Sequence, residues 1–361
     1  MLTPSRLKLA RNRRGLTREQ LSKLAGITTR SLLAYENGTQ RPSPDNLDRL
    51  AGALDMPTAF LRGGDVDEIP VEVISFRALS KITAGKRDMA RSAGRIAVML
   101  ARWIDQRRAL PTPDVPNLVG ADPEKAAEAL RNQWELPAGG IDNMINVLEA
   151  HGVCVFCVAM DCREVDAYSF VWNATPFVFL NTTKTAERTR FDAAHELGHL
   201  VLHAGAARPA RGPQAEREAD RFAGSLLMPR ASILASGLRN ASAEHIIAAR
   251  SQWQVSAMAL AYRLHELSLL TDWGYRAVCV DLARLGYRSG EPRGIAPEHS
   301  QLIADALQAA QPGPSLVAHA ADDLHLTVAE LETYIRGLIP AGGAVMHRRT
   351  PPRRPTLTLL P

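Results

Sequence analysis

The sequence has no run of about 18 or more apolar residues, so it offers no segment long enough to cross a membrane as a helix. Its first fifteen residues contain five basic side chains and no apolar stretch of signal-peptide length. Cysteine is scarce, with four in 361 residues, and this number does not suggest a disulfide framework. These absences argue against a secreted or membrane-spanning protein, and we expect a cytoplasmic one with two or three domains.

A charge excess is also lacking over most of the chain. Residues 63–361 carry a net charge of −1, whereas the first 62 residues hold eleven Lys and Arg against five Asp and Glu. The net charge of +5 therefore arises entirely from the N-terminal segment. A basic segment of this size indicates a polyanion as its partner.

The most informative motif that is present is HELGH, at residues 195–199. Apolar residues at three- and four-residue spacings around it predict a helix. His195 and His199 then lie one turn apart on the same face and can bind one metal ion, at about 2.0–2.1 Å each. Glu196 follows the first histidine, where an HEXXH motif has its general base.

The helix itself does not provide a third metal ligand. His203 lies eight residues beyond His195, which is about 12 Å along a straight helix, so it cannot share a metal ion with both histidines. The glycine and histidine that a metzincin motif requires are replaced here by Leu202 and Gly205. The third ligand must come from another part of the chain.

A second helical pattern, residues 216–229, provides acidic candidates. Its expected inward face consists of Ala219, Phe222, Ala223 and Leu226. Glu216 points with that face and is our choice of third ligand, whereas Glu218 is expected to point away. Asp220, one turn further on, is expected to orient a ligating histidine. The alternative is a solvated acidic run at the start of a helix, which the helix dipole would favour.

The segments FDAAHELGHLVLH and EREADRFAGSLLMP, in this order, resemble the ImmA/IrrE family of zinc metallopeptidases. The upstream segments VCVFCVAM and PFVFLNT and the downstream segment WQVSAMALAYRL extend the resemblance over residues 75–270. It implies a gluzincin-like site in which His195, His199 and Glu216 bind zinc and Glu196 acts as the base.

Residues 5–62 predict five short helices. Thr17 and Gln20 form a capping-box pattern at the start of the second helix, which ends at Gly26, and Thr28 caps the third. The residues expected to pack the second helix on the third are Leu21, Leu24, Ile27, Leu32 and Tyr35. Two such helices joined by a turn that contains glycine, in a small basic domain, predict a helix-turn-helix.

The segment GLTREQLSKLAGITTRSLLAYENGTQRPS closely resembles the lambda-repressor-like, XRE-type DNA-binding family. The resemblance implies that the N-terminal part of the third helix enters the major groove, with Arg30 as the best candidate for a bidentate contact to guanine. The DNA-contacting residues expected on this basis are Arg18, Thr28, Thr29, Arg30, Ala34, Asn37, Thr39 and Arg41. The alternative is a helical interaction module whose charges are only solvated.

Between the two motifs, the sequence predicts a connector opened by Gly63 and Gly64, an amphipathic helix over residues 87–108, and then further helices. The apolar stripe of the amphipathic helix is either core or a dimer seam. Strands are expected at residues 153–159, 167–172 and 177–180, before the HELGH helix. In a zincin, the edge of such a sheet can pair with an extended substrate.

The cysteines Cys154 and Cys157 form a CxxC pattern, with Cys162 nearby. In a strand, positions 154 and 157 face opposite sides of the sheet. We interpret them as small apolar core residues. A separate metal or redox site is the less favoured alternative.

Together these features predict an α+β protein with an all-α DNA-binding domain at residues 1–64. A connector and amphipathic helix (65–115), a zincin-like domain (116–272) and a helical C-terminal region with a disordered tail (273–361) are expected to follow. The predicted function is a DNA-binding regulator, probably a homodimer by its fold type, in which a zinc-dependent endopeptidase cleaves a repressor, an antitoxin or its own chain. The rival hypothesis is a transcription factor that uses the zincin fold only to sense a metal or ligand.

Overall fold

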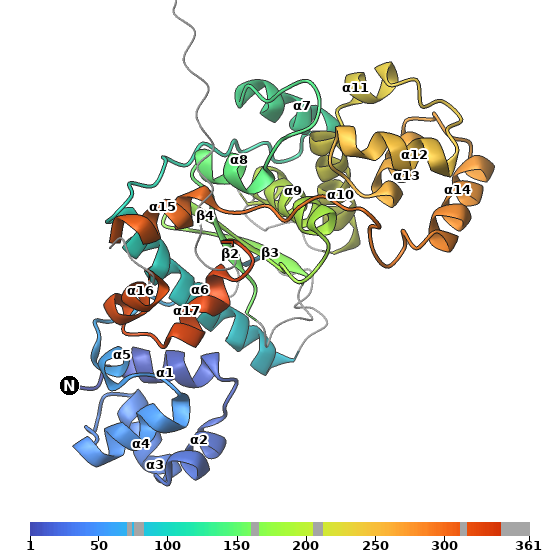
Figure 1. Ribbon diagram of the computed structural model, residues 1–361. Coiled ribbons are helices and arrows are strands. Elements are labelled where there is room, and N and C mark those ends of the chain that lie inside the picture. Colours follow the sequence, from blue (N-terminus) through green and yellow to red (C-terminus); the bar gives the residue numbers. More distant parts are fainter. Residues whose placement is uncertain (71–73, 76–82, 160–165, 205–211, 311–315, 341–361) are drawn as a thin grey trace, which may run out of the picture.

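The computed structural model describes residues 1–70, 74–75, 83–159, 166–204, 212–310 and 316–340. Cys162, most of the connector around residues 71–80 and the C-terminal tail lie outside this part, and so do the expectations that concern them. Within the described ranges, no helix is both long and apolar enough to cross a membrane. The architecture is α+β, with a small sheet among many helices (Figure 1).

The first 62 residues form the five predicted helices. They are α1 (Pro4–Arg13), α2 (Arg18–Ala25), α3 (Thr29–Glu36), α4 (Pro44–Leu54) and α5 (Thr58–Arg62). Thr17 and Gln20 make the reciprocal bonds of a capping box, and Gly26 ends α2 in the left-handed region, where glycine is not strained. One expectation is wrong. Leu24 is 63% exposed, because the short helix α2 buries only the narrow face of Leu21 and Ala25.

The sheet has four strands in the order β1-β3-β4-β2. They are β1 (Ile74–Ser75), β2 (Cys154–Cys157), β3 (Ala167–Trp172) and β4 (Thr175–Leu180). β3 and β4 form an antiparallel hairpin, while β2 runs parallel to β4. The hairpin turn consists of Asn173 and Ala174, both with positive φ. β1, which the sequence did not predict, pairs antiparallel with the outer side of β3.

Two long helices cover the sheet, α6 (Ala84–Asp105) on one face and α9 (Ala186–Leu202) on the other. The hydroxyl of Tyr168 donates to the carbonyl of Ala90 in α6, and Phe170 packs against Gly94 in the same helix. Ser169, between them on β3, points the opposite way and donates to Glu196 in α9. Of the two alternatives for the amphipathic helix, its stripe therefore belongs to the core around the sheet.

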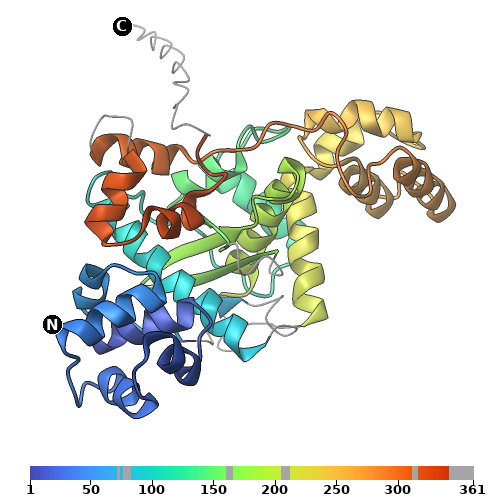
Figure 2. The ribbon, with the colours of Figure 1, turned by 60° about the horizontal axis from the view of Figure 1, so that its bottom comes forward.

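The remaining helices surround this centre. They are α7 (Pro123–Gln133), α8 (Met144–Ala150), α10 (Pro213–Leu227), α11 (Arg230–Ala235), α12 (Ala243–Ala249), the 3-10 turn η4 (Arg250–Gln252), α13 (Ala257–Glu266), α14 (Asp272–Arg284), α15 (Gln301–Ala310), α16 (Leu316–Leu324) and α17 (Val328–Ile335). Helices α11–α14 form a lobe beyond α10, and α15–α17 return to the side of α6 (Figures 1 and 2). Asp323 of α16 accepts from the indole N–H of Trp103 in α6, at 3.1 Å.

The N-terminal helices are docked on this body through α1, which packs on α6 and reaches α17. Arg13 of α1 donates to Glu330 of α17 at 2.7 Å, and Arg14 donates to the other oxygen of Glu330 at 2.8 Å. The side chains of Arg13 and Glu330 are 2% and 1% exposed, and Tyr334 adds hydrogen bonds to both. A buried, multiply bonded ion pair thus joins the first helix of the chain to its last described helix.

We expect Glu330→Gln to lower the free energy of unfolding by about 3–5 kcal/mol, because it leaves the buried charge of Arg13 without its counterion. Denaturant unfolding followed by circular dichroism measures this change. Glu332→Gln, two residues away, removes only an exposed pair with Arg336 and should stay within about 0.5 kcal/mol of the wild type. Equal effects of the two variants would contradict the structural role of the buried pair.

Candidate metal centre and nucleic-acid interface

The HELGH motif lies in the second half of α9, where the helix is enclosed on all sides. The hydroxyl of Thr185 caps the helix at its start by accepting from the backbone N–H of Arg188. His195, Glu196 and His199 are each at most 5% exposed. Charged and polar groups are buried in this way only where they have strong partners, so their surroundings define the site.

Gly198 determines how closely α10 approaches α9. A Cβ atom at position 198 would lie 3.0 Å from Cδ1 of Phe222 and 3.3 Å from Cα of Ala219. Any larger residue would therefore push α10 outward. The contact brings the first half of α10, with Glu216 and Asp220, up to the histidines.

The three expected ligands converge. Nε2 of His195 lies 3.1 Å from Nε2 of His199, and these atoms lie 3.5 and 3.6 Å from the carboxylate oxygens of Glu216. Tetrahedral zinc with bonds of about 2.0–2.2 Å requires donor atoms about 3.3–3.5 Å apart. Among the described residues, these three are grouped as possible metal ligands. The donor set and its spacing fit a zinc ion.

Asp220 holds the first histidine in the orientation that a ligand needs. Nδ1–H of His195 donates to the Asp220 carboxylate at 2.8 Å, which leaves Nε2 facing His199 and Glu216. Burial lowers the pKa of His195, but the hydrogen bonds to Asp220 and Glu216 outweigh it and raise the pKa to about 10. The surroundings therefore favour positive charge at this point, as a cation site requires.

The second histidine is oriented by a chain of two further side chains. Nδ1 of His199 lies 3.0 Å from Nδ1 of His203, whose Nε2 lies 3.0 Å from the carboxylate of Glu218. A neutral His203 that donates Nε2–H to Glu218 accepts Nδ1–H of His199, and Nε2 of His199 then keeps its lone pair. The expectation that Glu218 points away from the site is wrong, because His203 at the end of α9 reaches its carboxylate.

Glu196 lies on the sheet side of α9. Ser169 donates to its Oε2 at 2.7 Å, and the residue is fully enclosed. Burial raises the pKa of Glu196 to about 7, although the charge of His195 and the Ser169 hydroxyl lower it in part. Sequence reasoning did not single out Ser169, and the only signal for it was a small polar residue within an otherwise apolar strand.

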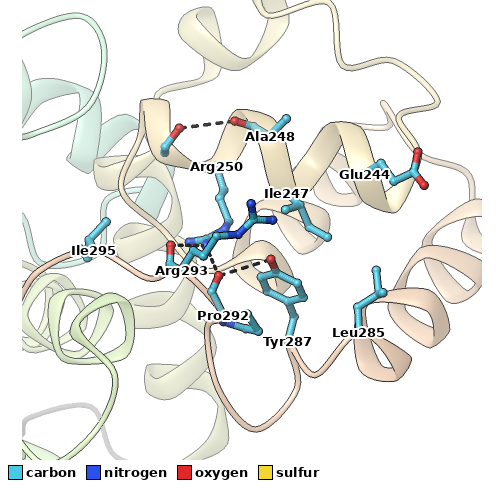
Figure 3. A pocket seen from close by; sticks show the side chains of 10 residues that line it. Glu244, Ile247, Ala248, Arg250, Leu285, Tyr287, Pro292, Arg293 and Ile295 are labelled. Carbon is cyan, nitrogen blue, oxygen red and sulfur yellow. Dashed lines mark hydrogen bonds between the residues drawn. The ribbon is translucent and has the colours of Figure 1, made fainter.

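A cavity of about 680 Å³ lies elsewhere, between α12–η4 and the segment after α14 (Figure 3). Its floor is Arg250, which stacks over Tyr287 and donates to the carbonyl of Pro292. Arg250 is also paired with the buried carboxylates of Glu187 and Glu291. These bonds attach the segment after α14 to the start of α9, and none of the expected ligands lines the cavity.

In the N-terminal domain, the third helix is at the end farthest from the sheet (Figure 1). Most of the expected DNA-contacting residues are exposed, namely Arg18, Thr28, Thr29, Arg30, Asn37, Thr39 and Arg41, while Ala34 is partly buried. Two of them also have structural roles. The Thr28 hydroxyl caps α3, and the Thr39 hydroxyl donates to the carbonyl of Ala34.

Arg18 is partly committed within the domain. Its Nε donates to Glu36 at 2.6 Å, and Arg11 donates to the other oxygen of the same carboxylate. The pair fixes the start of α2 against the end of α3. Among the expected contacts, Arg30 and Arg41 are thus the exposed guanidinium groups best placed to reach DNA.

Comparison with known families agrees with this division of the chain. Residues 7–61 match a helix-turn-helix family, and residues 148–265 match a peptidase family described as the IrrE N-terminal-like domain. The chain thus combines an XRE-type DNA-binding domain with an ImmA/IrrE-type, metallopeptidase-like domain. Searches of curated proteins and of solved structures gave no match.

For the metal site, we expect Glu216→Ala to weaken zinc binding much more than Glu218→Ala, because only the first removes a donor atom. Asp220→Ala should weaken it by about 10- to 100-fold, since the ligating histidine loses its orienting partner. Competition with a chromophoric chelator measures each affinity. Glu128→Ala, an exposed residue of α7, serves as the control. Equal losses for the two glutamates of α10 would disprove the assignment of Glu216.

Proposed function

We propose that this chain is a DNA-binding regulator whose second domain is a zinc-dependent endopeptidase. The observation that carries the proposal is the convergence of His195, His199 and Glu216 within 4.8 Å, beside the buried carboxylate of Glu196. The match to a peptidase family over residues 148–265 supports the same assignment.

The chemistry follows from these positions. A zinc ion held by the three ligands supplies Lewis acidity, which activates water and polarises a peptide carbonyl. Glu196 is the general base, and because Ser169 binds its Oε2, Oε1 is the oxygen that accepts the proton of the attacking water. Asp220 and the His203–Glu218 pair are positioning groups, since each keeps a ligating histidine in one tautomer.

One observation favours the rival hypothesis, in which the fold senses a metal or ligand without cleavage. All four groups of the site are buried or nearly so, and β1 lies across the outer side of β3, so the conformation described is a covered one. A peptidase requires that this cover can be displaced, whereas a sensor does not.

The exposed basic surface of the first domain supports an operator as its partner. Helix-turn-helix domains of this kind usually bind two half-sites as a pair, so we propose a homodimer on DNA. A peptidase held there has a high effective concentration for proteins bound nearby. On this basis we propose a repressor, an antitoxin or the chain itself as the substrate, in the cytoplasm.

For peptide hydrolysis, zinc-loaded protein should cleave members of a library of extended fluorogenic peptides. Glu196→Gln should lower the rate by at least about 100-fold, because the general base is lost while the metal ligands remain. Liquid chromatography with mass spectrometry identifies the products.

The matched control for this test is Glu244→Gln, an exposed residue of α12. Equal turnover by the wild type and Glu196→Gln would show that the hydrolysis does not come from this site. No turnover by a zinc-loaded wild type would favour the sensor.

For DNA binding, Arg30→Ala is expected to cost about 1–3 kcal/mol on the specific operator and to relax its sequence preference. Arg41→Ala should instead weaken binding to all sequences and reduce the salt slope by about one. Fluorescence anisotropy on operator and random duplexes at several salt concentrations separates the two. Equal losses on both duplexes for Arg30→Ala would remove it from the base-reading set.

A further inference from the structure

The outer side of β3 is the sheet edge closest to the proposed general base. Ser169 of β3 donates to Glu196, so the backbone of β3 passes within one side chain of the reacting carboxylate. On this outer side lies β1, with Ser75 in register with Ser169 and Ile74 with Phe170. Neighbouring strands are about 4.8 Å apart, so β1 runs where an incoming peptide would meet the site.

An extended peptide adds to an exposed strand by backbone hydrogen bonds, which is the commonest way in which a sheet edge captures a peptide. The other end of the sheet does not suit this role. β2 is contacted by α8 and α17, and the side chain of Cys157 in β2 lies 3.2 Å from the hydroxyl of Thr182. β1 is antiparallel to β3, and it therefore already occupies the edge next to Glu196 as a short added strand.

The chain before β1 is fixed, which sets where β1 arrives. Arg95 of α6 donates to the carbonyls of Val66 and Asp67, at 2.8 Å each, and Ile69 is 1% exposed. On the other side, Lys8 of α1 pairs with Glu68 at 2.8 Å. From Ile69, the five steps to Ile74 span at most about 18 Å. The connector is thus clamped between the DNA-binding domain and α6 just before it reaches the sheet.

We propose that the outer edge of β3 is the peptide-binding edge of this site, and that β1 occupies it as an internal competitor of extended peptide substrates. The inference rests on the proposed function, because it concerns the substrate of the same site. A two-residue strand makes few hydrogen bonds, and its hold on the edge comes from its tether, which keeps its local concentration high. A longer peptide can displace it, and it recognises β3 through its backbone.

Ser75→Pro tests this in the full-length, zinc-loaded protein, because proline lacks the N–H that a ladder requires. Ser75→Ala keeps that N–H and is the matched control. If β1 covers the edge for about nine-tenths of the time, Ser75→Pro lowers KM for an extended reporter peptide by about 10-fold, with kcat unchanged. Ser75→Ala keeps the wild-type KM.

A second measurement does not depend on turnover. Hydrogen exchange should show faster exchange of the amides of residues 169–171 in Ser75→Pro than in the wild type or Ser75→Ala. A synthetic peptide of residues 70–79, added to a Ser75→Pro, Glu196→Gln double variant, should restore their protection.

The outcomes separate the inference from the function on which it rests. If no variant cleaves any peptide but exchange changes as described, the edge assignment stands and the peptidase proposal fails. If Ser75→Pro leaves both KM and the exchange of residues 169–171 unchanged, β1 does not compete for this edge and the inference is wrong. Protection that the added peptide cannot restore would likewise overturn it.

Discussion

The close contact between α9 and α10 at Gly198 is the constraint on which the candidate site depends. The histidines come from one helix, while the third donor and the orienting carboxylate come from the other. Only a residue without a side chain lets Ala219 and Phe222 come near enough to bring Glu216 within reach of both imidazoles. The buried charges of the site then have partners in place when the two helices pack, which offsets the cost of removing them from water.

Local signals predicted the start and end of many elements. The capping box at Thr17, the left-handed Gly26 and the cap at Thr327 all lie where the residues indicate, because each depends on bonds within a few residues. The metal ligands were proposed for a similar reason. Helical periodicity places His195 and His199 on one face and turns Glu216 toward the apolar side of α10.

What sequence reasoning missed depends on contacts between distant segments. β1 consists of only two residues and exists because β3 offers an edge, so no local pattern indicates it. Helices α11 and α14 were also missed. The partner of Glu218 could not be foreseen, since it requires His203 to turn back at the end of α9. Arg13 reads as one more basic residue of a DNA-binding domain, yet it is buried against a helix more than 300 residues away.

That docking has a consequence for the life of the chain after any cut in the connector. The first domain is attached to the body by the packing of α1 on α6 and by the bonds of Arg13 and Arg14 to Glu330, in addition to the covalent link. A single break between residues 70 and 83 would therefore leave two fragments that remain associated as a non-covalent complex. Release of the DNA-binding fragment requires a separate undocking step, so the proteolytic event and the loss of the operator-bound assembly are kinetically distinct.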